Sequence, residues 1–323
     1  MRPWLLIPVL AALLGAPPLP ARAAGAVLVM NSREASLSVI DLASRQELRR
    51  IPVLREPHHW ALTPDRQDLL VGDSSGNEIV VLDPATFEVR RHVPLSDPYQ
   101  LGFSPDGKFL VVNALHRAQV DVYEPGTYRL LKRFPLSYMP SHMAFAPDSA
   151  TVYVSLQGSG KLAAIDLRGM AVRWTTEVGL TPAGVLWLNG RVLVANMGSA
   201  DVAVVDPADG RVERLIHAGK GAHQLFLSPD GKRVYVNNRL DNDSVIALDA
   251  ATLAVLRRYK VPGGPDDTAF APDGTLWLTL RLANKVAVLD PASGQAGLID
   301  VGRSPHGIFL NPRAVLPVPG AVP

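Results

Sequence analysis

Short runs of apolar and β-branched residues alternate with turn residues along most of the chain. Seven of these runs end in an acidic residue, at residues 38–41, 80–83, 120–124, 163–166, 203–206, 246–249 and 287–290. The acidic ends lie 40 to 43 positions apart. A period of about 40 to 45 residues is typical of the four-stranded blades of a propeller. Two-helix solenoids have a similar period, but the strand alternation and the density of Gly and Pro exclude them.

Each repeat contains the same pattern of four strands. The first strand ends in a Ser-Pro-Asp-Gly type turn, as at residues 104–107 and 228–231. In such a turn Pro presets one dihedral angle, Asp bonds its own backbone, and Gly accepts the positive φ that closes the hairpin. The third strand carries the acidic end, and an Asp-Pro-Ala-Thr type turn leads to the fourth. The sequence therefore predicts an all-β, seven-bladed β-propeller.

The phase of the repeat predicts how the ring closes. The first recognisable strand, residues 27–30, has the pattern of a second strand, whereas the last, residues 307–310, has the pattern of a first strand. We expect this C-terminal strand to pair with the N-terminal three strands in one blade, because this leaves no free sheet edge. The expected organisation is a propeller over residues 24–311 and a Pro-rich C-terminal tail over residues 312–323.

The N-terminal residues 1–23 predict a cleavable signal peptide. Arg2 is followed by an apolar run, and the small residues Ala21 and Ala23 flank Arg22 before the expected cleavage site. The run is too short and too rich in proline to span a bilayer, and no later segment is a candidate. We expect a periplasmic or secreted protein with no membrane span in the mature chain, and a monomer.

Composition excludes several classes of function. The chain has no cysteine, which excludes disulfides, thiolate metal sites, iron–sulfur clusters, c-type haem attachment and a cysteine nucleophile. It has 32 Lys and Arg against 30 Asp and Glu. Two of the arginines lie in the segment that we expect to be removed. A mature chain with almost no net charge argues against nucleic acid as a partner.

The repeat motifs resemble a known family. The Ser-Pro-Asp-Gly turn, the Tyr-Val-x-Asn strand at residues 235–238 and the Val-x-Val-Asp ending are similar to the YVTN-type, YncE-like seven-bladed propellers of exported bacterial proteins. The same repeat is shared by the d-type haem domain of periplasmic nitrite reductase. The resemblance covers essentially the whole mature chain and implies the fold. It implies little about function, because such scaffolds host unrelated tasks.

Candidate functional residues appear when the repeats are aligned on the turn proline. The two positions six and five residues before it hold five of the eight histidines, where chance would place fewer than one. The first strand of each blade lines the central channel. We call these paired positions the hub and predict that they converge on one channel mouth as a ligand-binding site. The candidate binding residues among them are His58, His59, Tyr99, Gln100, His142, His223, Asp266, Asp267 and His306.

A ring of histidines and carboxylates has chemistry suited to several ligands. Imidazole nitrogens bind transition metals, and the predicted metal ligands are His58, His59, His142, His223 and His306. Metal affinity is then expected to fall as the pH drops through about 6.5, where imidazole takes up a proton. The family resemblance suggests instead a haem-like tetrapyrrole over the hub. In a simpler interpretation the histidines only bond neighbours and water, because adjacent side chains of a strand point in opposite directions.

Loops after the second strands carry arginines at corresponding positions. These are Arg33, Arg117, Arg239 and Arg281. They would suit an anionic group such as a propionate. Solvated loop arginines are the simpler expectation. Polar residues at the ends of the same strands, such as Asn113 and Asn237, are explained by turn formation.

Three functional classes remain open. The first is a binding or accessory module that holds a metal, a haem-like cofactor or a small ligand at the hub, with a possible periplasmic partner protein. The second is a hub-site enzyme, either a lactonase-type hydrolase with Asp266 or Asp267 as general base or a metal-dependent oxidoreductase. The third is a protein-interaction scaffold. The sequence contains no recognisable nucleophile, which favours the binding module.

Overall fold

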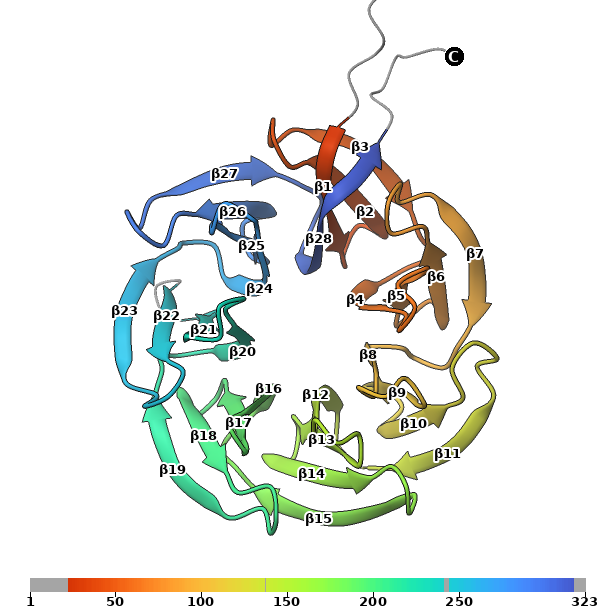
Figure 1. Ribbon diagram of the computed structural model, residues 1–323, viewed down its shortest axis with the longest axis vertical. Helices are drawn as coiled ribbons and strands as arrows, with labels where there is room; N and C mark the ends of the chain where they lie inside the picture. The colour runs from red at the N-terminus through yellow and green to blue at the C-terminus, as the bar shows by residue number, and fades with distance from the viewer. Residues whose placement is uncertain (1–22, 137, 241–243, 317–323) are drawn as a thin grey trace, which may run out of the picture.

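The computed structural model describes residues 23–136, 138–240 and 244–316. These residues form seven four-stranded antiparallel sheets arranged as blades around a central axis (Figure 1). The predicted all-β, seven-bladed propeller is confirmed. Residues 1–22 of the predicted signal peptide and residues 317–323 of the predicted tail lie outside the described residues.

The strands fall into four concentric layers. The inner strands, in chain order of the blades, are β4 (Pro57–Leu62), β8 (Gln100–Phe103), β12 (Pro140–Phe145), β16 (Pro182–Leu188), β20 (Ala222–Leu227), β24 (Pro265–Phe270) and β28 (Pro305–Leu316). The second strands are β5 (Leu69–Asp73), β9 (Leu110–Ala114), β13 (Thr151–Leu156), β17 (Arg191–Asn196), β21 (Arg233–Asn238), β25 (Leu276–Leu280) and β1 (Ala23–Asn31).

The outer half of each blade is built in the same way. The third strands are β6 (Glu78–Leu82), β10 (Gln119–Tyr123), β14 (Lys161–Asp166), β18 (Asp201–Val205), β22 (Ser244–Asp249), β26 (Lys285–Leu289) and β2 (Ser36–Asp41). The outer strands are β7 (Val89–Pro94), β11 (Leu130–Pro135), β15 (Ala171–Glu177), β19 (Val212–His217), β23 (Val255–Lys260), β27 (Ala296–Asp300) and β3 (Glu47–Pro52).

Burial follows these layers. Every residue of β5 and β6 is buried, because the middle strands of a blade contact a neighbouring blade on each face, whereas β7 is mostly exposed. The core is accordingly divided into clusters between adjacent blades. One of them packs Leu28 and Phe309 of the last blade against Leu69 and Phe87 of the first. Non-directional apolar packing of this kind fixes the spacing of the blades and hence of the inner strands.

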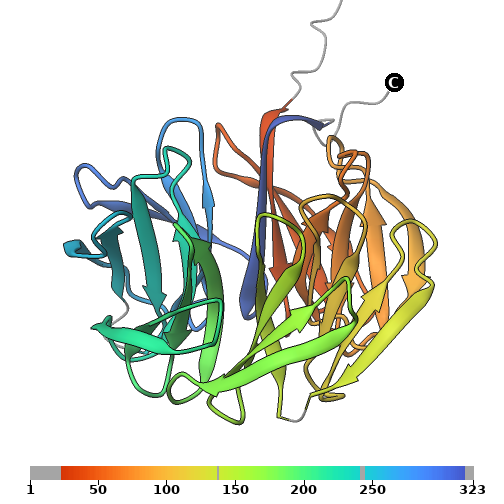
Figure 2. The same ribbon diagram turned by 60° about the horizontal axis from the view of Figure 1, so that its bottom comes forward.

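The ring closes by pairing the two ends of the chain. β28 forms the inner strand of a blade whose other strands are β1, β2 and β3. β1 and β28 run side by side, as the red and blue strands of Figure 2 show. The pairing continues to Ala24 with Val315 and Ala23 with Leu316. β28 extends five residues past the expected end of the propeller at residue 311, and β1 begins at residue 23, the last residue of the predicted signal peptide.

Candidate functional site

The adjacent residues His58 and His59 both reach the centre of the ring because inner strand β4 contains a β-bulge. Pro57 pairs with Asp73 and Trp60 with Val71, so three steps along β4 oppose two steps along β5. Corresponding shifts occur in β12, β16, β20, β24 and β28. A bulge interrupts the strict alternation of a strand and re-aims a side chain. The simpler interpretation of the histidines assumed that adjacent side chains of a strand point in opposite directions. The bulge shows that this assumption does not hold for His58 and His59.

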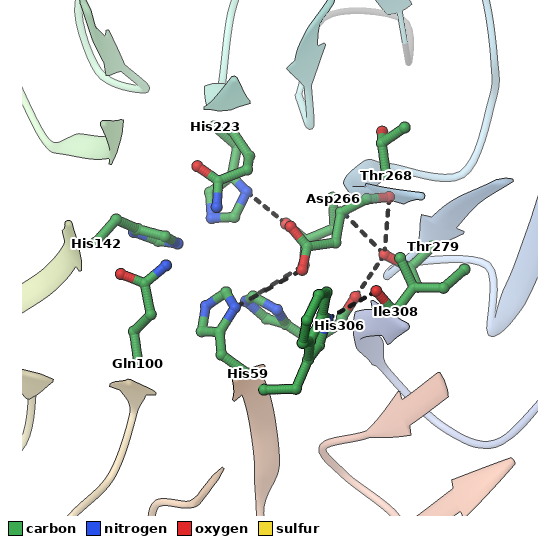
Figure 3. Close-up of polar contacts among 12 residues, drawn as sticks. His59, Gln100, His142, His223, Asp266, Thr268, Thr279, His306 and Ile308 are labelled. Atoms are coloured by element: carbon green, nitrogen blue, oxygen red, sulfur yellow. Dashed lines mark hydrogen bonds and ion pairs between the residues drawn. The ribbon is translucent and has the colours of Figure 1, made fainter. Parts of the chain in front are cut away.

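The five hub histidines lie together although they come from four blades. The ring centroid of His306 is 3.8 Å from that of His58 and 4.5 Å from that of His59. His142 lies 5.1 Å from His59 and 5.2 Å from His223. No histidine of the five exposes more than 4% of its surface. Figure 3 shows the rings of His59, His142, His223 and His306 gathered around the channel near Asp266.

Several of these buried imidazoles have a ring nitrogen with no hydrogen-bond partner among the described residues. The atoms are Nδ1 of His58, Nε2 of His59, Nε2 of His142, Nδ1 of His223 and both ring nitrogens of His306. Leaving a buried polar atom unpaired costs about 1–3 kcal/mol, so a cluster of such atoms indicates a place for a ligand.

Three of the rings have the spacing of a metal site. His58, His59 and His306 each offer a nitrogen, and these atoms lie within 4.8 Å of one another. A tetrahedral ion with bonds of about 2.1 Å places its nitrogen ligands about 3.4 Å apart. Small rotations of the side chains therefore suffice to bring the three nitrogens to one ion.

The buried position keeps the histidines neutral, which is the form that binds metal. Burial lowers the pKa of His59 to about 3. Burial also holds the pKa of His58, His142 and His306 well below its usual range. The expected loss of affinity near pH 6.5 is corrected accordingly: proton competition should begin at a lower pH.

The adjacent carboxyl groups Asp266 and Asp267 have opposite environments. Burial alone would raise the pKa of Asp266, but Arg239 and the neighbouring histidines lower it well below its usual range. Burial, followed by the negative charge of Asp266, raises the pKa of Asp267 well above its usual range. Oδ2 of Asp267 lies 3.7 Å from Nδ1 of His59. Asp266 is thus an ionised carboxylate beside a carboxyl group that tends to keep its proton.

Two of the loop arginines are part of the hub. Arg239 donates to Oδ1 of Asp266 from Nε at 3.0 Å and from Nη2, and Arg281 donates from Nη1 to Oδ2 at 3.2 Å. Their side chains are 18% and 19% exposed, whereas that of Asp266 is fully buried. The expectation that these arginines are merely solvated is wrong. Arg117, in contrast, bonds Asn77 on the exposed surface.

Hydrogen bonds between blades fix the backbone of the hub. A side chain at the end of one second strand donates to the carbonyl oxygen of the first hub residue of the next blade: Asn113 to Ser141 at 3.0 Å, Asn237 to Asp266 at 2.9 Å, and Thr279 to His306 at 2.7 Å. Sequence reasoning assigned Asn113 and Asn237 to turns and missed Thr279. Aligning the repeats could have identified these donors, since the three residues occupy the same position at the end of a second strand.

Glycine fills two hub positions where the neighbouring blade comes close. A Cβ added to Gly184 would lie 2.7 Å from the carbonyl oxygen of His223. A Cβ added to Gly307 would lie 2.4 Å from the carbonyl oxygen of His58. Contacts this short are not tolerated, so both positions require glycine and the ring of polar side chains has gaps there.

The other predicted site residues line or support the hub. The ring of Tyr99 lies 4.0 Å from that of His58. Oε1 of Gln100 accepts a hydrogen bond from the backbone of Met143 at 2.6 Å, so this amide braces the next blade. The histidines outside the hub are on outer strands or loops: His92 contacts Glu78, His116 contacts Asp97, and His217 is exposed.

Parts of the chain are similar to two characterised proteins. Protein NirF of Pseudomonas aeruginosa is 28% identical over 126 residues, which are 38% of this chain and 32% of NirF. The human E3 ubiquitin-protein ligase TRIM56 is 28% identical over 179 residues, which are 52% of this chain and 23% of the ligase. The similarity thus spans about a third or less of each relative.

Solved structures share the fold at low sequence identity. A protein of unknown function from Desulfotomaculum acetoxidans superposes with a TM-score of 0.76 at 15% identity, covering 88% of this chain and 98% of its own. Dihydro-heme d1 dehydrogenase NirN in complex with DHE gives 0.66 at 16% identity, with 92% and 78% covered. The periplasmic gluconolactonase PpgL of Pseudomonas aeruginosa gives 0.70 at 20% identity, with 88% and 98% covered. These likenesses establish the fold alone.

The described part of the chain contains no helix that is long and apolar enough to cross a bilayer. The family comparison covers almost the whole sequence. The model of the YNCE-like β-propeller family matches residues 5–315. The resemblance expected from the repeat motifs is confirmed, and the chain belongs to the YNCE-like β-propeller family.

Proposed function

We propose that this protein is a binding module that holds a transition-metal ion at the hub of the propeller. The observation that carries the proposal is the cluster of buried, neutral imidazoles whose nitrogens have no hydrogen-bond partner in the described part of the chain. His58, His59 and His306 would supply the ligands, with His142 beside them. Imidazole suits zinc, copper, iron and nickel, and an all-nitrogen set excludes none of these.

An accessory role fits this site better than a catalytic one. The chain has no recognisable nucleophile, and its cationic and anionic groups at the hub are paired with each other. The signal peptide expected at residues 1–23 would place the protein in the periplasm or outside the cell. There it would hold or deliver the ion, with or without a partner protein.

A haem-like tetrapyrrole is the second candidate ligand. The similarity to NirF, and to NirN solved with DHE, favours it. The hub itself favours a bare ion, because the unpartnered nitrogens are enclosed within the channel. For a tetrapyrrole, one of these histidines would have to supply a ligand to the iron.

Metal titration of the purified protein tests the proposal. The chain is stripped with a chelator and titrated with Zn²⁺, Cu²⁺ and haemin, followed by calorimetry and visible absorption. We expect saturable binding of one ion, which the double substitution His58→Gln with His306→Gln abolishes. The matched control His92→Gln with His217→Gln removes two histidines outside the hub and should bind as the unmodified chain does.

The other outcomes identify the competing functions. No bound ion in the unmodified protein would refute the metal proposal. An absorption band that appears only with haemin would favour the tetrapyrrole. Turnover of a panel of lactones that depends on Asp267 would favour a hydrolase of the kind suggested by the fold of PpgL. With none of these, the scaffold interpretation would stand.

A further inference from the structure

The hub contains two overlapping groups of potential metal ligands that share His306. One group is His58, His59 and His306, and the other is His223, Asp266 and His306. In each group the ligand atoms lie within 4.8 Å of one another and all three residues are buried. Spacing alone does not distinguish them. Their hydrogen-bond partners do.

Both ring nitrogens of His223 lie close to a charged partner. Nη2 of Arg239 lies 2.8 Å from Nε2 of His223. A guanidinium group only donates hydrogen bonds, so Nε2 is the acceptor and the proton is on Nδ1. Nδ1 in turn faces Oδ1 of Asp266 at 2.7 Å. A metal ion could bind His223 only by displacing one of these two charged partners.

Asp266 is also fully engaged, and its surroundings repel a cation. Arg239 occupies Oδ1 and Arg281 occupies Oδ2. Two guanidinium charges therefore lie within hydrogen-bond distance of the one carboxylate charge. A divalent ion brought to this carboxylate would meet two positive groups at close range in a medium of low dielectric constant.

His306 connects this network to the three-histidine group. Its Nε2 lies 3.6 Å from Oδ2 of Asp266, and its carbonyl oxygen is held by Thr279. A carboxylate facing one imidazole nitrogen commonly fixes the ring and its tautomer and leaves the other nitrogen for a metal. Figure 3 shows Asp266 between His223 and His306 in this arrangement.

We propose that Asp266 is a positioning residue and not a metal ligand: clamped by Arg239 and Arg281, it orients His223 and His306, so that the hub binds a single ion on His58, His59 and His306. This inference rests on the proposed function and specifies the ligands and the stoichiometry. The arginines keep the carboxylate from moving toward the ion.

The first test compares two buried, arginine-paired aspartates. Asp266→Asn removes the positioning charge. Asp121→Asn removes the charge of a fully buried aspartate on β10, which Arg133 binds away from the hub. Loss of a supporting carboxylate typically weakens metal binding by about 10- to 100-fold. We expect Asp266→Asn to bind the ion about 10- to 100-fold more weakly while still binding one ion per chain. The affinity of Asp121→Asn should be unchanged. Equal effects in the two variants would overturn the proposal.

A second pair of variants keeps the test decisive if Asp266→Asn does not fold. His223→Gln replaces a neutral side chain that the proposal excludes as a ligand, so binding of one ion should persist, whereas His306→Gln should abolish it. Two ions bound by the unmodified protein, or loss of all binding in His223→Gln, would contradict the inference.

The orientation of the rings is also measurable without metal. Nitrogen-15 chemical shifts of the stripped protein should show His223 as the Nδ1–H tautomer. The Nδ1 shift of His223 should change in Asp266→Asn, because Nδ1 loses its charged partner, and should not change in Asp121→Asn. If the unmodified chain bound no ion, the proposed function would fail while this measurement still tested the positioning role. An unchanged Nδ1 shift of His223 in Asp266→Asn would refute that role.

Discussion

Lowering the pH from about 7.5 to about 5.5 should strongly destabilise the metal-free protein. Burial holds the pKa of His58, His142 and His306 well below its usual range and lowers that of His59 to about 3. In the unfolded chain the same imidazoles titrate near pH 6.5. The unfolded state therefore takes up protons that the folded state does not, and the free energy of unfolding falls as the pH falls.

The magnitude follows from the number of buried rings. Each histidine that stays neutral in the folded state lowers the free energy of unfolding by about 1.4 kcal/mol between the two pH values. Four such histidines lower it by about 5 to 6 kcal/mol. Asp267 acts in the opposite direction, because burial and the charge of Asp266 raise its pKa and the folded state keeps a proton that the unfolded state releases. That offset is at most about 3 kcal/mol, which leaves a net loss of about 3 to 6 kcal/mol. Domains of ordinary stability have about 5 to 15 kcal/mol in total.

Urea denaturation followed by circular dichroism, with a chelator present, measures this loss. Replacing His142 by Gln should reduce the difference between the two pH values by about 1.4 kcal/mol, whereas His217→Gln, at an exposed position, should leave it unchanged. A loss below about 1 kcal/mol in the unmodified chain would refute the view that the hub histidines are buried and neutral.

Three further substitutions test other features of the hub by the same denaturation assay. Asp267→Asn should stabilise the protein at about pH 8 relative to its effect at about pH 6, because the folded-state pKa of Asp267 is raised and the ionised form is disfavoured by about 1.4 kcal/mol for each pKa unit; an equal effect at both pH values would contradict this. Thr279→Val removes the donor to the carbonyl oxygen of His306 and should cost about 1 to 2 kcal/mol together with part of the metal affinity. Gly184→Ala should lower the free energy of unfolding by about 1 to 3 kcal/mol, because its Cβ would meet the carbonyl oxygen of His223. An unchanged free energy of unfolding would show that strand β20 can move away from the added Cβ.

The fold and the location of the hub could be predicted because both depend on register. Each repeat places its apolar run, its turn proline and its acidic end at nearly constant spacing, and residues of equal register in a closed ring face the same channel. The pairing of β28 with β1 followed from the phase of the repeat alone. The extent of that pairing did not, because residues 312–316 lie beyond the repeat pattern and pair with Ala23 and Ala24, near the other end of the chain.

Most contacts within the hub could not be predicted, since they join atoms from different blades. Arg239 and Arg281 have the sequence context of solvated loop residues. Only the position of Asp266, in the blade after that of Arg239 and in the same blade as Arg281, makes them its partners. The bulge that lets His58 and His59 share the channel is likewise invisible in a strand pattern of period two.

The closing strand also sets the order of events during biosynthesis. His306 lies on β28, the last strand of the chain, and is 248 positions from His58 (306 − 58). Contacts between such distant positions form late, because the entropy of closing the loop must be overcome before the contact stabilises anything. The three-histidine site therefore does not exist in a nascent or truncated chain. Capture of an ion would report that β28 has been synthesised and that the ring has closed.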